Sequence, residues 1–177
     1  MAKQRSQSHP PDGISTEHIA LRPRHRRPAV ISLLILGAVV ATGLSGLAGG
    51  RRAEHVVHNA AGAFSFTAPD VVRNGELLES RARVIAERPI GKLVIGIEPA
   101  LWRELTTNST VPQAGEESYR DGLFRFTFDR LEAGATFEFQ VAQQVNPSLW
   151  GVNRGRVVFL DGDRVLAEIP IAMRVLP

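Results

Sequence analysis

Residues 29–50 form a run of 22 residues without a charged side chain, AVISLLILGAVVATGLSGLAGG. As an α-helix rising 1.5 Å per residue, this run would extend ~33 Å, which matches a hydrocarbon core about 30 Å thick. Basic residues lie on both sides of it, Arg26 and Arg27 before and Arg51 and Arg52 after. The run therefore predicts a transmembrane helix over 29–50.

The charges on the two sides of the run predict its orientation. Six basic and two acidic residues precede it, a net charge of +4, whereas only two basic residues follow it closely. Because Lys and Arg are enriched on the cytoplasmic side, we expect a cytoplasmic N-terminus and an extracytoplasmic C-terminal domain in a single-pass plasma-membrane protein. A cleavable signal peptide, cut near Gly46 to Ala48, is the alternative. The preceding region of 28 residues and the length of the run favour an uncleaved signal anchor.

Composition and pattern divide the rest of the chain into three parts. Residues 1–28 are a polar, basic arm that we expect to be disordered in the cytoplasm, because they hold few large apolar side chains. Residues 51–62 predict a tether, and residues 63–177 predict one folded domain. Residues 51–177 carry 15 basic and 16 acidic side chains, so the basic pI belongs to the arm. This charge balance argues against a nucleic-acid partner.

Beyond the tether, apolar residues recur with a period of two, which is typical of β-strands. Phe124, Phe126 and Phe128 share one face of a clear strand, and Leu131 to Gly134 predicts a turn into a second alternating strand, 137–142. Together these two strands predict an antiparallel hairpin whose Phe side chains form much of the core.

Other segments are assigned by their turn residues and polarity. Asp161-Gly162 predicts a type I′ turn in a final hairpin, and Pro170 in its second strand indicates an edge position or a bulge. Residues 99–105 predict a short helical stretch. Residues 106–121 and 144–155 predict polar loops.

About seven short strands over ~115 residues predict a single all-β sandwich. The stretch FRFTFDRLEAGATFEFQVAQQVNP (124–147), with Leu131 and Gly134 in its turn, resembles the immunoglobulin-like repeats of bacterial surface proteins. The resemblance implies an Ig-like sandwich used for display, spacing or adhesion. The excess of Arg over Lys in the chain, 19 against 2, also suggests a bacterial source.

The residues available for chemistry argue against an enzyme. All five His residues precede residue 59 and Cys is absent, which excludes His-dependent triads and the usual zinc sites from the domain. Three groups have the residue types of a chemical site. Glu116-Glu117 has those of an acid–base pair, Asp161-Gly162-Asp163 those of a calcium site, and His55 with His58 those of a metal or pH site. Solvated-loop, turn and tether interpretations are preferred for them, so we expect no cofactor and no metal.

Aromatic and small residues are the remaining candidates for contacts. Trp102 and Trp150 are interpreted as caps on the two ends of the core, or else one of them is an exposed anchor for a partner, with Tyr119 as a further contact on a loop. Asn108-Ser109-Thr110 has the form of a glycosylation site but is interpreted as a turn.

Small residues in the apolar run suggest a helix contact. Gly37, Ala41, Gly46 and Gly50 permit close approach of a second helix.

We therefore expect a membrane-tethered extracytoplasmic β-sandwich with a binding or structural role at the cell envelope. Its expected partners are membrane lipid and an envelope or integral membrane protein, or the cell wall. The alternative is an accessory subunit that docks through its transmembrane helix to an integral membrane complex.

Overall fold

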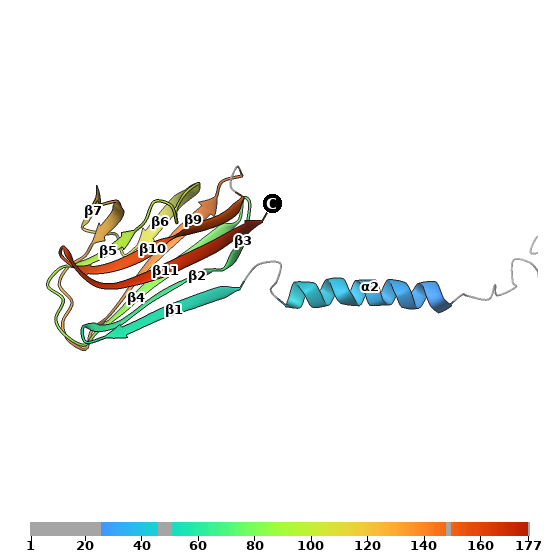
Figure 1. Cartoon of the computed structure of the whole chain (residues 1–177), viewed down its shortest axis with the longest axis horizontal. Coiled ribbons are helices and arrows are strands. Elements are labelled where there is room, and N and C mark those ends of the chain that lie inside the picture. Colours follow the sequence, from blue (N-terminus) through green and yellow to red (C-terminus); the bar gives the residue numbers. More distant parts are fainter. Residues whose placement is uncertain (1–25, 46–50, 148–149, 177) are drawn as a thin grey trace, which may run out of the picture. The chain divides into compact units, whose positions relative to one another are not determined.

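The computed structural model describes residues 26–45, 51–147 and 150–176, which form one helix and a β-sandwich (Figure 1). The chain divides into two units after Ala41, so most of the helix belongs to one unit and the sandwich to the other. The helix is α2 (Arg26–Leu44). The strands are β1 (Arg52–Asn59), β2 (Gly62–Pro69), β3 (Val71–Arg73), β4 (Leu77–Ala86), β5 (Leu93–Ile97), β6 (Leu105–Val111), β7 (Glu116–Arg120), β8 (Leu123–Thr127), β9 (Thr136–Val145), β10 (Gly151–Asp161) and β11 (Arg164–Leu176).

Helix α2 covers the first part of the predicted membrane segment. Its large apolar side chains between Val30 and Leu44 are exposed around the helix. Among the residues that the structure describes, no helix combines the length and the apolar character needed to cross a membrane. Residues 46–50 of the predicted segment and residues 1–25 of the predicted arm lie outside the described residues.

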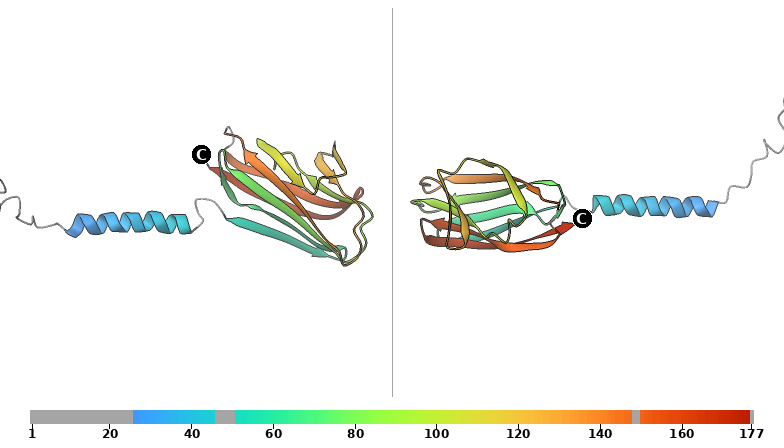
Figure 2. Two further views of the ribbon diagram at one scale, coloured as in Figure 1. Left: turned by 180° about the vertical axis from the view of Figure 1, so that it is seen from behind. Right: turned by 90° about the horizontal axis from the view of Figure 1, so that it is seen from above.

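The strands form two sheets packed face to face, which confirms the all-β sandwich (Figure 2). One sheet has five strands in the order β1-β2-β4-β9-β6, and the other has six in the order β3-β11-β10-β5-β8-β7. The expected count of about seven strands is wrong, because the described residues form eleven. The additional strands are short or polar, and their sequences lack the alternation that marks a half-buried strand.

The sandwich begins earlier than expected, at Arg52 instead of Ala63. Most of the segment predicted as a tether is β1, which pairs antiparallel with β2 from Arg52 opposite Pro69 to Asn59 opposite Gly62. Alternate β1 side chains turn inward, and Val57 packs against the core. Its side chains are small or polar, which is why the sequence does not reveal the strand.

The predicted Phe-rich hairpin does not form, although both of its strands exist. β8 pairs with β5 and β7 in the six-stranded sheet, whereas β9 pairs with β4 and β6 in the other. The chain crosses between the sheets after β8, and the Phe residues meet across the sandwich. The ring centroid of Phe128 lies 4.7 Å from that of Phe137 and 5.0 Å from that of Phe139. The predicted Phe-rich core is therefore present with a different connection.

The final hairpin and the edge position of Pro170 are confirmed. β10 and β11 pair around a two-residue turn, Gly162 and Asp163, in which Gly162 has a φ of +62°. Asp163 does not share this positive φ, so the turn is not of the expected type I′. Pro170 pairs with Arg156 on one side, while β3 joins the other side of β11 only from Arg174 onward. Its missing N–H therefore interrupts no ladder.

Two segments predicted as loops contain strands. Residues 106–121 hold most of β6 and all of β7, and the predicted 144–155 loop is interrupted by the start of β10 at Gly151. Asn108-Ser109-Thr110 lies within β6 at a bulge and is not a turn. Residues 99–104 form turns in place of the predicted helical stretch, with Trp102 N–H donating to the Pro99 carbonyl at 3.1 Å, and Leu105 already begins β6.

Candidate binding groove

The two sheets leave a groove at one lateral edge of the sandwich. β6 is the last strand of one sheet and β7 of the other, and the groove lies between β6 and the β7–β8 hairpin. Its volume is about 590 Å³, within the range typical of small-molecule sites. The lining residues are Trp102, Leu105, Thr107, Asn108, Ser109, Thr110, Gln113, Glu117, Phe124 and Phe126.

Aromatic rings form one side of this groove. The ring of Trp102 stacks on Phe124 with centroids 6.3 Å apart and lies 5.5 Å from the ring of Phe126. Phe126 is buried in the core, whereas Phe124 is 38% exposed. Tyr119, on β7, lies 5.4 Å from Phe124. The groove thus has a platform of rings that the core itself holds in place.

Hydroxyl and amide side chains form the opposite side, on β6. Thr107, Asn108, Ser109 and Thr110 all line the groove although they are consecutive in sequence. In an unbroken strand, neighbouring side chains would point to opposite faces. The register between β6 and β9 shifts between Thr107 and Ser109, so a bulge breaks the alternation at Asn108.

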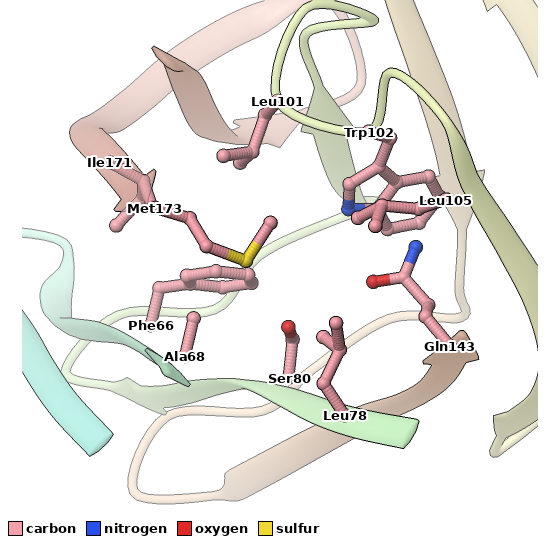
Figure 3. A pocket seen from close by; sticks show the side chains of 10 residues that line it. All are labelled: Phe66, Ala68, Leu78, Ser80, Leu101, Trp102, Leu105, Gln143, Ile171 and Met173. Atoms are coloured by element: carbon pink, nitrogen blue, oxygen red, sulfur yellow. The ribbon is translucent and has the colours of Figure 1, made fainter. Parts of the chain in front are cut away.

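A small cavity lies inside the sandwich beside the groove, and Trp102 and Leu105 line both (Figure 3). It holds about 10 Å³, roughly the space of one water molecule. Figure 3 shows the polar ends of Gln143 and Ser80 directed into this otherwise apolar space. Gln143 is 1% exposed, and its Oε1 has no hydrogen-bond partner. Its Nε2 donates to Thr107 Oγ1 at 3.4 Å.

A charged cluster ties the β7–β8 turn to the β10–β11 turn on the outer side of the six-stranded sheet. The buried Arg125 guanidinium donates to the Gly162 carbonyl at 2.6 Å and to Asp163 at 2.8 Å, and it pairs with Asp121 at 3.3 Å. The hydrogen bond from Arg125, together with the charge of Arg120, lowers the pKa of Asp163 below its ordinary value of 3.8. Each charge in this cluster is matched, which is typical of a structural network.

A second charged cluster lies on an exposed part of the same sheet. Arg156 donates from Nε to Glu98 at 2.7 Å and from Nη1 to Glu168 at 2.8 Å. These two hydrogen bonds raise the pKa of Arg156 above its ordinary value. Glu98 also accepts the Arg156 backbone N–H, so this cluster fixes the start of the buried part of β10.

Two of the three aromatic residues predicted to contact a partner meet in one place. Trp102 and Tyr119 both lie against Phe124, which the sequence assigned to the core. Trp102 is half-buried against the core, in keeping with the predicted cap. Trp150 is 77% exposed and caps nothing, so that interpretation is wrong for it. The groove residues that the sequence did not reveal include Phe124 and the β6 side chains. The polar run at 106–110 was a signal for β6, whereas Phe124 had none.

The two carboxylates and the two histidines that the sequence places close together do not act as pairs in the fold. Glu116 forms an ion pair with Lys92 at 3.7 Å, whereas Glu117 lines the groove. The two carboxylates therefore lie in different environments and do not form a pair. His55 and His58 are three residues apart on β1 and therefore lie on opposite faces.

The small residues of the apolar run are only partly described. Gly37 and Ala41 lie on α2, and Gly46 and Gly50 lie outside the described residues.

Acidic side chains do not gather into a metal-binding group in the described part of the chain. Asp161 accepts the Lys92 N–H at 3.0 Å and pairs with Arg164 at 3.1 Å, while Asp163 pairs with Arg125. Within residues 26–45, 51–147 and 150–176, no cluster of three or more His, Cys, Asp or Glu side chains is placed to hold a metal ion.

Comparisons with known proteins identify no family. No protein-family model and no curated protein matches the sequence. Among solved structures, the chain is similar to a GH20 exo-β-N-acetylglucosaminidase from Vibrio harveyi in complex with N-acetylglucosamine, with a TM-score of 0.31 and 12% sequence identity. The similarity covers 72% of this chain and 18% of that enzyme. A likeness this low carries no inference about function.

Proposed function

We propose that the chain is a non-catalytic, membrane-anchored binding module of the bacterial cell envelope, and that its groove binds a neutral glycan strand. The groove between β6 and the β7–β8 hairpin is the observation that carries this proposal. It combines an aromatic platform with neutral polar side chains in a volume of about 590 Å³. Accessory attachment through the apolar helix is the second candidate.

The character of the lining supports a glycan over a charged ligand. Glu117 is the one charged residue among those that line the groove, and the opposing wall carries hydroxyl and amide groups from Thr107 to Thr110. Sugar rings have an apolar C–H face that stacks on aromatic rings, and their hydroxyls exchange hydrogen bonds with Thr, Ser and Asn. Trp102 and Phe124 supply the rings, and β6 supplies the hydrogen-bonding groups.

The bulge in β6 also favours a glycan over an added peptide strand. An extended peptide that pairs with a sheet edge needs a regular row of free N–H and C=O groups. The bulge at Asn108 interrupts this row and turns consecutive side chains toward the groove. The edge therefore offers side-chain groups where strand addition would need backbone groups.

The anchor is proposed from the apolar run at 29–50 and its basic flanks. The described helix adds that apolar side chains cover its whole circumference, as expected of a helix that is surrounded by lipid or by other apolar helices. With a cytoplasmic N-terminus, the sandwich would lie outside the plasma membrane, where envelope glycans are found.

The absence of catalysis is proposed from the available side chains. The sequence holds no His beyond residue 58 and no Cys. The described carboxylates nearest a hollow are either paired with Arg or Lys, as are Asp163 and Glu116, or stand alone, as does Glu117. A lone carboxylate without an oriented partner is a poor general acid–base system.

Binding can be tested with Trp102 as the reporter. The Trp150→Phe variant of the full chain, in phosphatidylcholine nanodiscs that contain no sugar headgroup, would be titrated with a hexamer of β-1,4-linked N-acetylglucosamine. We expect a saturable change in Trp102 emission. Adding Phe124→Ala should weaken binding roughly tenfold, because the stacked ring is lost. Val56→Ala, which truncates an exposed side chain on β1 at the opposite edge, is the matched control.

The outcomes separate the ligand class from the site. No saturable change with the hexamer would reject a neutral glycan as the ligand. Equal weakening by Phe124→Ala and Val56→Ala would place binding outside the groove.

The accessory-subunit candidate makes a different prediction. Gly37 offers open space where a Cβ would lie, and Ala41 follows one turn later, so α2 has a small-residue face. Scrambling residues 29–50 while preserving their composition should then abolish co-purification of a membrane complex. Under the glycan proposal, the scrambled chain keeps its binding to the hexamer.

A further inference from the structure

We propose that the end of the sandwich at which β1 begins rests on the lipid headgroups, with Trp150 and Leu77 inserted into the membrane interface. The inference rests on the proposed membrane anchor and adds a lipid-binding surface to the folded domain. This surface, the entry end, is defined by Arg51, Arg52, Leu77, Trp150 and the last residues of β11.

Hydrogen bonds connect the chain entry to Trp150 across neighbouring strands. The Arg51 carbonyl accepts the Asp70 N–H at 3.1 Å, and the Asp70 carbonyl accepts the Arg174 N–H at 2.8 Å. Gly151, directly after Trp150, pairs with Val175. With strands about 4.8 Å apart, this ladder puts Trp150 within roughly three strand spacings of Arg51.

Leu77 lies on the same end. Leu77 and Arg52 line one shallow hollow of about 140 Å³, together with Pro69 and Glu76. Leu77 is 70% exposed although it begins a strand whose inward side chains are buried. Among the described residues, the entry end therefore exposes Leu77 and Trp150, and neither belongs to the core.

Covalent geometry limits the distance of the entry end from the membrane. The apolar run ends at Gly50, and β1 begins at Arg52. Two peptide units extend at most about 7 Å. If the run spans the bilayer, the first residue of the sandwich must lie at the level of the headgroups, where an amphipathic Trp ring is favoured.

The charged groups at the entry end suit a zwitterionic surface. Arg51, Arg52 and Arg73 are exposed there, next to the acidic side chains of Asp70 and Glu76. The Glu76 carboxylate accepts the Arg73 N–H at 2.7 Å, so it is partly satisfied within the turn. Both signs of charge are present, and insertion of Trp150 therefore does not depend on anionic lipid.

The opposite end of the sandwich supplies an internal control. β10 runs eleven residues from Gly151 to Asp161, a length of about 33 Å. Tyr119 and the β10–β11 turn line one hollow at that far end, and Tyr119 is 63% exposed. Figure 1 shows β7 and β3 at opposite ends of the sandwich. A tryptophan reporter at 119 thus matches Trp150 in exposure but not in position.

Bromolipid quenching tests the inference on the full chain. In the first variant, Trp102→Phe leaves Trp150 as the sole tryptophan. A second, triple variant moves the sole tryptophan to the far end by combining Trp102→Phe, Trp150→Phe and Tyr119→Trp. Both would be reconstituted into phosphatidylcholine liposomes with and without brominated acyl chains, with flotation to measure incorporation. We expect brominated lipid to reduce the emission of Trp150 at least twofold, with a blue-shifted maximum, and to leave the emission of the reporter at 119 unchanged.

The outcomes distinguish failure of the proposed membrane anchor from failure of the proposed lipid contact at the entry end. Floating protein whose Trp150 is quenched no more than the reporter at 119 overturns the inference and leaves the anchor intact. The same absence of quenching is expected if Trp150 is the contact site of a partner protein and does not insert into lipid. Protein that fails to float overturns the anchor and, with it, the inference.

Discussion

At one lateral edge of the sandwich β1 and β11 come together, whereas at the other β6 and β7 leave a groove between the sheets. At the closed edge, Asn59 Nδ2 of β1 donates to the Leu166 carbonyl of β11 at 2.8 Å, and Val57 packs into the core. At the open edge, aromatic rings remain partly exposed. The same two-layer packing thus uses one edge for stability and leaves the other available for binding.

The largest difference should come from truncating one phenylalanine near each edge. Phe64 on β2 is fully buried, with its ring 5.3 Å from Phe159. Phe64→Ala should lower the free energy of unfolding by about 3–5 kcal/mol, since it leaves a cavity. Phe124→Ala at the open edge should cost less than about 1.5 kcal/mol, because that ring is partly solvated. Urea unfolding of both variants measures the two losses, and equal losses would contradict the division between the edges.

Glycines in two hairpins provide the next comparison. A Cβ at Gly62, in the β1–β2 hairpin, would clash with the Ile85 carbonyl oxygen of β4, and its φ of +154° disfavours a side chain. Gly122, in the β7–β8 hairpin, also has a positive φ, but a Cβ there meets open space. Gly62→Ala should cost more than about 2 kcal/mol, and Gly122→Ala about 1 kcal/mol. Thermal unfolding of both variants measures the two stability losses. A larger loss for Gly122→Ala than for Gly62→Ala would contradict the prediction.

The two edges also differ in how well the sequence predicts them. Alternation at 123–128 and the Asp161-Gly162 turn predict their strands correctly, because half-buried strands and tight turns have local signatures. β1 and β6 are edge strands with small or polar side chains, and such strands lack that signature. The pattern alone does not tell a hairpin from a crossover, because the same connection joins β8 to β9 in either case.

The candidate site was predictable only in part, for a related reason. Trp102 and Tyr119 stand out as isolated aromatic residues near polar segments. Phe124 shares the alternation of Phe126 and Phe128 and is indistinguishable from them in sequence. It is exposed because β8 lies one strand from the sheet edge, where the facing sheet ends. This exposure depends on how the two sheets overlap, which is a property of the whole sandwich.

A smaller effect should follow from pH at the turn beside the open edge. The hydrogen bond from Arg125 and the charge of Arg120 lower the pKa of Asp163 in the folded chain. The stabilisation is then fully present above the unfolded pKa of about 4 and is lost as pH falls through the folded pKa. Asp163→Asn should therefore be less stable than the native chain at pH 7, and this difference should shrink as the pH falls below the unfolded pKa of about 4 and through the lowered folded pKa.

Urea unfolding as a function of pH measures this effect. Asp129→Asn is the matched control, since Asp129 is exposed and makes no ion pair among the described residues. A stability difference for Asp163→Asn that persists unchanged at low pH would show that the amide perturbs the turn itself. The Arg125 network would then stabilise the turn through geometry alone, with no contribution linked to protonation of Asp163.

The smallest effect is expected inside the sandwich, at the cavity beside the open edge. Gln143 Oε1 is buried without a hydrogen-bond partner, and an unsatisfied buried oxygen is destabilising. Gln143→Leu removes this oxygen and costs only the 3.4 Å contact with Thr107, an exposed side chain. The free energy of unfolding should stay unchanged or rise by up to about 1 kcal/mol. A loss of more than about 1 kcal/mol would contradict this expectation and would indicate that the Gln143 amide is satisfied in the folded chain. The interior beside the open edge would then be as well satisfied as that beside the closed edge, and the two edges would differ only in the shape of their surfaces.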